Sequence, residues 1–150
     1  MLTELCLYLK NWFDLDQPKF FGRFKIENGT LISLNDGDMG ILENQYYRIV
    51  GSTFNDGVYK HGSEQLIDES FNGAVWLMAV PPAVISLVTE IALWQEKYGS
   101  VDSSNMSPFN SESFAGYSYS KSSGGSSASS SSVPTWQGVF ADRLRRYRKI

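Results

Sequence analysis

The sequence predicts an α+β fold, in which a small helical core is joined by two β-hairpins and a long extended arm rich in serine. Three observations lead to this prediction. Apolar residues recur at helical spacing in three places, Asn-Gly and Asn-Asp-Gly turns separate strand-like runs, and residues 118–132 are almost entirely Ser and Gly. A length of 150 residues allows one domain with one core.

The first predicted element is an N-terminal helix that ends near residues 14–16, before Pro18. Its apolar face consists of Leu2, Leu5, Cys6, Leu9, Trp12 and Phe13. The segment lacks a basic start and a small-residue cleavage site, so we do not expect a signal peptide. Cys6 is the only cysteine, which excludes an internal disulfide and favours a small buried apolar side chain.

Two hairpins are predicted next. Asn28-Gly29 stands between strand-like runs, and this dipeptide is a strong hairpin signal because both central residues adopt positive φ. Residues 45–52 and 58–60 are aromatic and β-branched, and the turn residues 55–57 connect them. Residues 70–80 form a further extended apolar segment that ends at two prolines.

Two more helices follow. The central helix is expected near residues 82–98, with a broad apolar face and Gly99 as its C-terminal cap. The C-terminal helix is expected near residues 135–148, with Thr135 as its N-cap. Its apolar stripe is Trp136, Val139, Phe140, Leu144 and Tyr147, and its cations are Arg143, Arg145, Arg146, Arg148 and Lys149.

These elements divide the chain into three predicted parts: a folded core at residues 1–99, an aromatic and serine-rich arm and tether at 100–133, and a basic amphipathic docking helix at 134–150. Charge follows the same division. Residues 136–150 hold five cations against one acid, whereas the other 135 residues hold eight cations against fifteen acids, a net charge of −7. A positive tail on a negative body favours docking on an acidic surface of another subunit.

The arm carries aromatic residues that a flexible tether has no reason to contain, namely Phe109, Phe114, Tyr117 and Tyr119. A monomer that exposed them all would present a large apolar patch, and Tyr is among the residues that anchor protein interfaces. We therefore predict that the arm contacts another subunit.

Enzymatic and cofactor chemistry are not expected. His61 is the only histidine, and no nucleophile or acid pair accompanies it at a useful spacing, so a solvated loop histidine is the favoured interpretation. One His and one Cys cannot build a zinc site within one chain. We predict no catalytic residue, metal or cofactor, and no membrane-spanning segment.

The ordered set of motifs resembles the head–tail adaptor, or connector, proteins of tailed bacteriophages. The motifs are YYRIVGSTFNDGVY, ESFNGAVWLMAVPPAVISL, SPFNSESFAGYSYSK and the terminal WQGVFADRLRRYRKI. The resemblance implies a structural virion protein that forms a homo-oligomeric ring, typically of twelve copies, between the portal and the tail in the virion neck, after assembly in the host cytoplasm. It implies that the ring extends the channel for double-stranded DNA without reading its sequence and binds the next neck or tail-completion protein.

Carried onto this chain, the resemblance assigns Phe109, Phe114, Tyr117 and Tyr119 to an inter-subunit arm. It assigns a portal-docking tail to Trp136, Phe140, Arg143, Leu144, Arg145, Arg146, Tyr147, Arg148 and Lys149. Two alternatives stay open. One is a nucleic-acid-binding module that uses the basic C-terminal helix on phosphates, and the other is a small tail-associated binding module.

Overall fold

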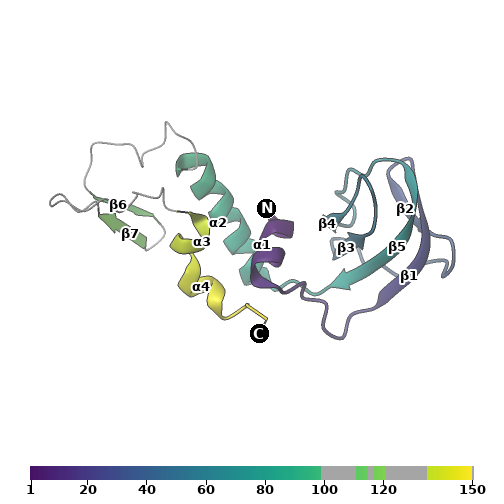
Figure 1. The fold of residues 1–150 in the computed structure, drawn as a ribbon, viewed down its shortest axis with the longest axis horizontal. Helices are drawn as coiled ribbons and strands as arrows, with labels where there is room; N and C mark the ends of the chain where they lie inside the picture. Colours follow the sequence, from purple (N-terminus) through teal and green to yellow (C-terminus); the bar gives the residue numbers. More distant parts are fainter. Residues whose placement is uncertain (99–110, 115–116, 121–134, 150) are drawn as a thin grey trace. The chain divides into compact units, whose positions relative to one another are not determined.

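The computed structural model describes residues 1–98, 111–114, 117–120 and 135–149 (Figure 1). The described residues contain four helices, a curled five-stranded antiparallel sheet and a separate two-stranded sheet, which confirms the α+β class. The chain forms two compact units, Leu2–Pro82 and Ala83–Arg148. The predicted core at residues 1–99 is thus divided between them, because the central helix groups with the residues that follow it.

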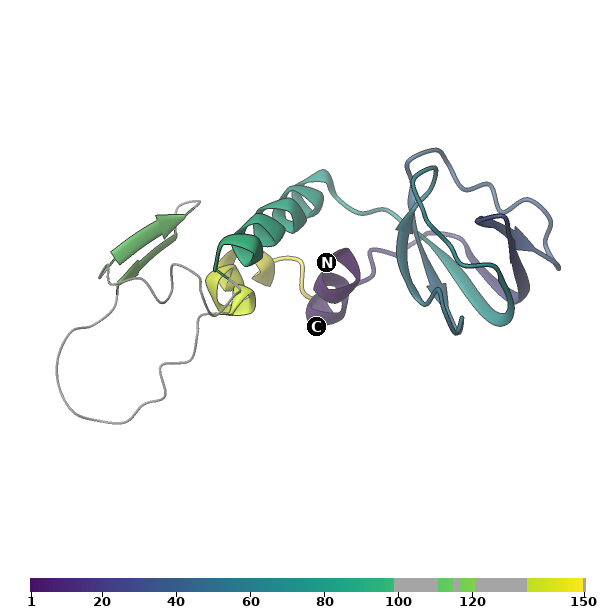
Figure 2. The ribbon, with the colours of Figure 1, turned by 90° about the horizontal axis from the view of Figure 1, so that it is seen from above.

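The first unit is built on the curled sheet (Figures 1 and 2). Its strands are β1 (Lys19–Glu27), β2 (Thr30–Ser33), β3 (Tyr46–Val50), β4 (Gly57–Lys60) and β5 (Glu69–Met78), in the spatial order β2-β1-β5-β3-β4. The long strand β5 pairs with β1 on one side and with β3 on the other. It is therefore the strand that joins the two outer pairs, β1–β2 and β3–β4, into one sheet.

The connection between β1 and β2 is a tight turn at Asn28 and Gly29, whose φ angles are 52° and 72°. The carboxylate of Asp68 accepts hydrogen bonds from the backbone N–H groups of both turn residues, at 3.1 and 3.0 Å. These bonds hold the pKa of Asp68 below its usual value. The turn is thus fixed by residues distant in the sequence as well as by its own conformational preference.

The longer connection between β3 and β4 is organised by the buried side chain of Asn55. Its amide accepts a hydrogen bond from the N–H of Ile67 and donates one to the carbonyl of the same residue. It also donates to the carboxylate of Glu69, which accepts hydrogen bonds from Ser52 as well. Because these hydrogen bonds satisfy the polar groups of the buried amide, they fix the loop in one conformation. The loop leaves the ring of Phe54 62% exposed.

One hydrophobic cluster lies on one face of the sheet, in addition to the buried apolar residues that the helices carry. Its strand residues lie at alternate positions, because successive side chains of a strand point to opposite faces of the sheet. Its buried members are Phe24, Ile26, Met39, Tyr47, Ile49, Leu66, Phe71, Val75 and Leu77. The sheet thus carries its own core.

The opposite face of the sheet carries a row of stacked cations and indoles. In register, Lys19 lies beside Trp76, and Trp76 lies beside Arg48. The Arg48 guanidinium lies 4.9 Å from the Trp76 ring centroid and 3.4 Å from that of Trp12, which covers it. Burial lowers the pKa of Arg48, and the nearby charge of Asp56 opposes that shift. The stack fastens the segment that precedes β1 onto the sheet.

The N-terminal helix α1 (Leu2–Leu9) ends earlier than predicted, since the sequence placed its end near residues 14–16. Lys10, Phe13 and Asp16 all have positive φ, so the chain leaves the helical conformation directly after Leu9. Trp12 packs on Arg48 instead of continuing an apolar helical stripe. The helical spacing of Trp12 and Phe13 was therefore misleading.

The second unit contains helix α2 (Pro82–Tyr98), strands β6 (Ser111–Phe114) and β7 (Tyr117–Ser120), and helices α3 (Trp136–Val139) and α4 (Ala141–Arg145). Helix α2 has the bounds that the sequence predicts. The C-terminal helix, predicted as one element near residues 135–148, is instead two short helices that meet at Phe140. Gly138 lowers helical stability at this point. Thr135 is the N-cap, and its side chain accepts from the N–H of Gly138.

Gly73 and Gly138 offer a matched pair of stability tests. A Cβ at Gly73 would lie 2.0 Å from the carbonyl oxygen of Val50, so the β3–β5 backbones would have to separate. We expect Gly73→Ala to lower the free energy of unfolding by about 1–3 kcal/mol, as overpacking does. A Cβ at Gly138 would meet nothing closer than 3.8 Å. Gly138→Ala should raise stability by about 0.5–1 kcal/mol, and urea unfolding followed by circular dichroism measures both. Equal effects of the two substitutions would contradict the close β3–β5 approach.

Candidate docking surface

Three of the five residues of the apolar stripe in the C-terminal segment are buried within their own chain. Trp136, Phe140 and Leu144 are only 8%, 3% and 1% exposed. The sequence assigned these three side chains to contacts with a partner. In this structure they are core residues of the second unit, so they offer no surface to another protein.

Arg143 also has a partner within the chain. Its guanidinium donates two hydrogen bonds to the carboxylate of Glu90 on α2, at 2.5 and 2.9 Å. Hydrogen bonding to Arg143 holds the pKa of Glu90 below its usual value, and the same bond raises the pKa of Arg143. A bidentate pair of this kind fixes orientation as well as distance. Arg143 therefore holds α4 on α2 instead of standing free for docking.

The remaining cations of the tail are exposed, and we refer to Arg145, Arg146, Arg148 and Lys149 as the basic end. The structure shows no ion pair between them and an acidic side chain in the described part of the chain. Arg146 lies over the ring of Tyr147, 5.1 Å from its centroid, and Tyr147 is half-buried. Four positive charges within five residues thus face solvent on a segment whose apolar side is already packed.

The predicted arm is described only in its backbone. Strands β6 and β7 pair antiparallel, with Phe114 opposite Tyr117 and Glu112 opposite Tyr119. Phe109 and most of the serine-rich tether lie outside the described residues. The two strands pair with each other, and no other described strand pairs with either.

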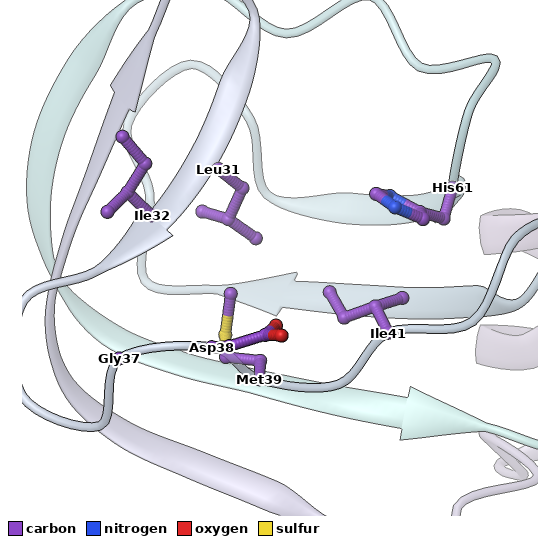
Figure 3. Close-up of a pocket in the computed structure, with 7 residues that line it drawn as sticks. All are labelled: Leu31, Ile32, Gly37, Asp38, Met39, Ile41 and His61. Atoms are coloured by element: carbon purple, nitrogen blue, oxygen red, sulfur yellow. The ribbon is translucent and has the colours of Figure 1, made fainter.

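A hollow of about 320 Å³ lies beside β2 in the first unit (Figure 3). Its lining is Leu31, Ile32, Gly37, Asp38, Met39, Ile41 and His61. Figure 3 shows Leu31 and Ile32 of β2 across the hollow from His61, with Met39 and Ile41 below them. The prediction did not include this hollow, since its walls come from three separated segments that only the curled sheet brings together.

His61 lies in the loop after β4, as the sequence suggested, and its side chain is 39% exposed but has partners within the chain. It is half-buried, and its Nδ1 atom lies 3.0 Å from the carboxylate of Glu64, which also accepts a hydrogen bond from the hydroxyl of Tyr47 at 3.1 Å. Burial raises the pKa of Tyr47 well above its ordinary value. Burial opposes ionisation of Glu64, but hydrogen bonds from the backbone, His61 and Tyr47 outweigh it and lower the pKa of Glu64. The three groups form a structural network.

The described ranges contain no cluster of three or more His, Cys, Asp or Glu side chains that could hold a metal ion. Within residues 1–98, 111–114, 117–120 and 135–149, no helix combines the length and apolar character that crossing a membrane requires. Searches against protein-family models, curated proteins and solved structures found no significant match to this chain.

The Arg143–Glu90 pair predicts a pH-dependent contribution to stability. The folded state lowers the pKa of Glu90 below 4.5, so the contribution is complete above pH 4.5 and is lost as the pH falls through the lowered value. Because both side chains are partly exposed, we expect Glu90→Gln to cost roughly 0.5–1 kcal/mol at pH 7. The difference from the unsubstituted chain should shrink below pH 4.

Urea unfolding followed at 222 nm measures this difference at each pH. Glu96→Gln, on an exposed position of the same helix, is the matched control and should have little effect at either pH. A loss of stability for Glu90→Gln that stays the same at pH 3 and pH 7 would contradict the ion pair.

Proposed function

We propose that this protein is a structural virion protein of a tailed bacteriophage, which forms a ring between the portal and the tail. The proposal starts from the ordered resemblance of four segments to head–tail adaptors. The structural observation that carries it is the basic end, which stays exposed while the stripe beside it is buried. In this proposal the ring extends the DNA channel and offers a surface to the next neck or tail-completion protein.

The basic end is suited to dock on an acidic portal surface. Leu144 and the Arg143–Glu90 pair hold α4 in place, with Arg145 at its end and Arg146 and Arg148 directly after it in the same unit. Complementary charge of this kind mainly accelerates association and sets register. In this proposal, docking therefore depends on the cations alone. The sequence had also assigned Trp136, Phe140 and Leu144 to docking, but these residues are buried.

The ring itself requires contacts between copies. Identical chains arranged head-to-tail form heterologous interfaces, which close into a ring when the rotation permits. The β6–β7 hairpin, with Phe114, Tyr117 and Tyr119 in its strands, is the segment we assign to these contacts. The net charge of −7 outside the tail suits a channel through which double-stranded DNA passes without adhering.

A nucleic-acid-binding module is the second candidate, and the free cations of the basic end favour it. Stacking on bases requires exposed rings, however, and of the rings next to the basic end Trp136 is buried and Tyr147 is half-buried. Phosphate contacts alone would give weak, steeply salt-dependent binding without sequence preference. The observations therefore favour a protein partner over nucleic acid.

Charge reversal at the basic end tests the proposal. We expect Arg145→Glu, Arg146→Glu and Arg148→Glu together to slow association with the portal protein of the same phage on the order of tenfold or more, while the fold is kept. The matched control reverses Lys10, Arg23 and Lys60, which lie in the first unit, and so changes the net charge equally.

Surface plasmon resonance at two salt concentrations measures the portal association rate, and electrophoretic mobility shift measures binding to duplex DNA. Equal effects of the two triple variants would show that the basic end has no special role. Tight DNA binding by the isolated chain that only the tail variant loses, with portal binding unchanged, would establish the second candidate instead.

The arm gives a separate test. We expect Phe114→Ser with Tyr117→Ser to leave the thermal unfolding of the isolated chain within about 2 °C, because these rings serve contacts between copies. Ring formation on the portal, counted by electron microscopy, should decrease. A large drop in melting temperature would place these rings in the core of their own subunit and remove the arm from the proposal.

A further inference from the structure

The hollow beside β2 combines an apolar lining with two polar side chains (Figure 3). The apolar lining comes from β2 and from residues 39–41, and the polar side chains are those of Asp38 and His61. In Figure 3 the ring of His61 extends toward the side chains of β2, and the carboxylate of Asp38 extends toward Ile41. A concave site of about 320 Å³ with an apolar lining and a few placed polar groups is typical of small-ligand sites.

A largely buried network orients His61 and leaves one of its ring nitrogens for the hollow. Its Nδ1 atom lies 3.0 Å from the carboxylate of Glu64, which also accepts a hydrogen bond from the hydroxyl of Tyr47. The lowered pKa of Glu64 keeps this carboxylate ionised at neutral pH, so it accepts and the Nδ1 atom donates. In a neutral imidazole the other nitrogen, Nε2, is then an acceptor. No hydrogen bond joins Nε2 to a described residue.

Asp38 supplies a second acceptor. Its Oδ1 atom accepts a hydrogen bond from the N–H of Gly40 at 2.9 Å, which fixes the direction of the carboxylate. Among the described residues, no cation forms an ion pair with Asp38, and its Oδ2 atom accepts no hydrogen bond. An ionised carboxylate can only accept. Both polar side chains of the hollow are therefore suited to a ligand that donates.

The charge of the loops around the hollow has one sign. Residues 34–45 and 61–68, which bring Asp38 and His61 to it, contain no Lys or Arg. Lys60 lies just before His61, but it pairs opposite Tyr46 and thus stands on the sheet face of Arg48, away from the hydrophobic cluster. The acids of the two loops are Asp36, Asp38, Glu43, Glu64 and Asp68. Negative charge beside two acceptors favours a cationic donor and disfavours an anion.

We propose that the hollow binds an organic cation. Its head is an ammonium or guanidinium group, which donates hydrogen bonds to the carboxylate of Asp38 and to Nε2 of His61. Its apolar body lies against Leu31, Met39 and Ile41. A free alkylamine and a Lys or Arg side chain of a bound peptide share this chemistry, because each has an apolar stem and a cationic head. The site lies within the first unit and requires neither the ring nor the portal.

Titration of the ¹⁵N-labelled full-length chain with n-hexylammonium near neutral pH, followed by NMR, tests the site. A probe this small should bind with a Kd on the order of 1–10 mM. We expect saturable shifts at the backbone of residues 31–32 and 37–41 and at the ring nitrogens of His61. The matched controls are 1-hexanol and hexanoate, which have the same length without the positive charge and should bind at least about fivefold more weakly. Equal binding of all three compounds, or shifts that do not saturate with hexylammonium, would overturn the proposal.

The apolar lining is tested by the length of the probe. From ethylammonium through butylammonium to hexylammonium, affinity should rise roughly twofold to fourfold for each added CH₂ group, because each group buries more apolar surface. The same NMR titration measures this series. Affinity that does not depend on length would show that charge alone is recognised, and the hollow would then have no part in binding.

Two substitutions in one loop separate a direct contact from general attraction. Asp38→Asn keeps the oxygen that accepts from Gly40 but removes the charge, and it should weaken hexylammonium binding about tenfold. Asp36→Asn is the matched control, since Asp36 is exposed, does not line the hollow and changes the net charge equally. It should change affinity less than about twofold at physiological salt. Equal losses in the two variants would contradict a contact with Asp38.

N-acetylarginine amide distinguishes the two sources of the cation. Tighter binding of this compound than of hexylammonium assigns the hollow to an arginine side chain of a partner, whereas the reverse order assigns it to a free amine. In either case Asp38→Asn should weaken the tighter of the two compounds, and the shifts should stay at the residues of the hollow. Undiminished binding of that compound to the Asp38→Asn chain would reject the site.

Discussion

The pairing of β5 on both sides is the constraint on which the first unit depends. On one face of β5, the hydrophobic cluster includes Phe71, Val75 and Leu77. On the opposite face, Trp76 belongs to the row of stacked cations and indoles. The close approach of Gly73 to the Val50 carbonyl belongs to the same pairing. Because one strand supplies both faces, the core, the Arg48 stack and the curl of the sheet cannot vary independently. The curl in turn brings β2 near the chain after β4 and creates the hollow between them.

In the second unit, the Arg143–Glu90 pair has the corresponding role for the C-terminal segment. The two helices α3 and α4 have four and five residues, too few to be stable by themselves. They persist because Trp136, Phe140 and Leu144 are buried and Arg143 is bound. The same packing converts a predicted free docking helix into a fixed support, on which the other four cations are displayed. The burial of the apolar side chains and the exposure of the other cations thus both follow from the packing of the C-terminal segment.

The sequence predicted those features that local chemistry determines. Positive φ at Asn28-Gly29, the proline at the start of α2 and the Thr135 cap each depend on neighbouring residues, and the structure contains all three. The prediction failed where residues distant in the sequence determine the local structure. Trp12 has helical spacing, but Arg48, 36 positions later in the sequence, takes its ring out of the helix. The apolar stripe that contains Trp136 and Phe140 was predicted correctly. The sequence pattern does not tell, however, whether the residues that bury this stripe belong to the same chain or to another.

The site shows the same division between local and distant information. Clustering of Arg145, Arg146 and Arg148 is visible in the sequence, whereas the capture of Arg143 by Glu90 is not, since the two are 53 residues apart. The hollow beside β2 was invisible for the same reason, because Ile32, Asp38 and His61 meet only through the curl of the sheet. Sequence reasoning can therefore find exposed charge and unusual composition, and it misses sites whose walls are assembled by topology.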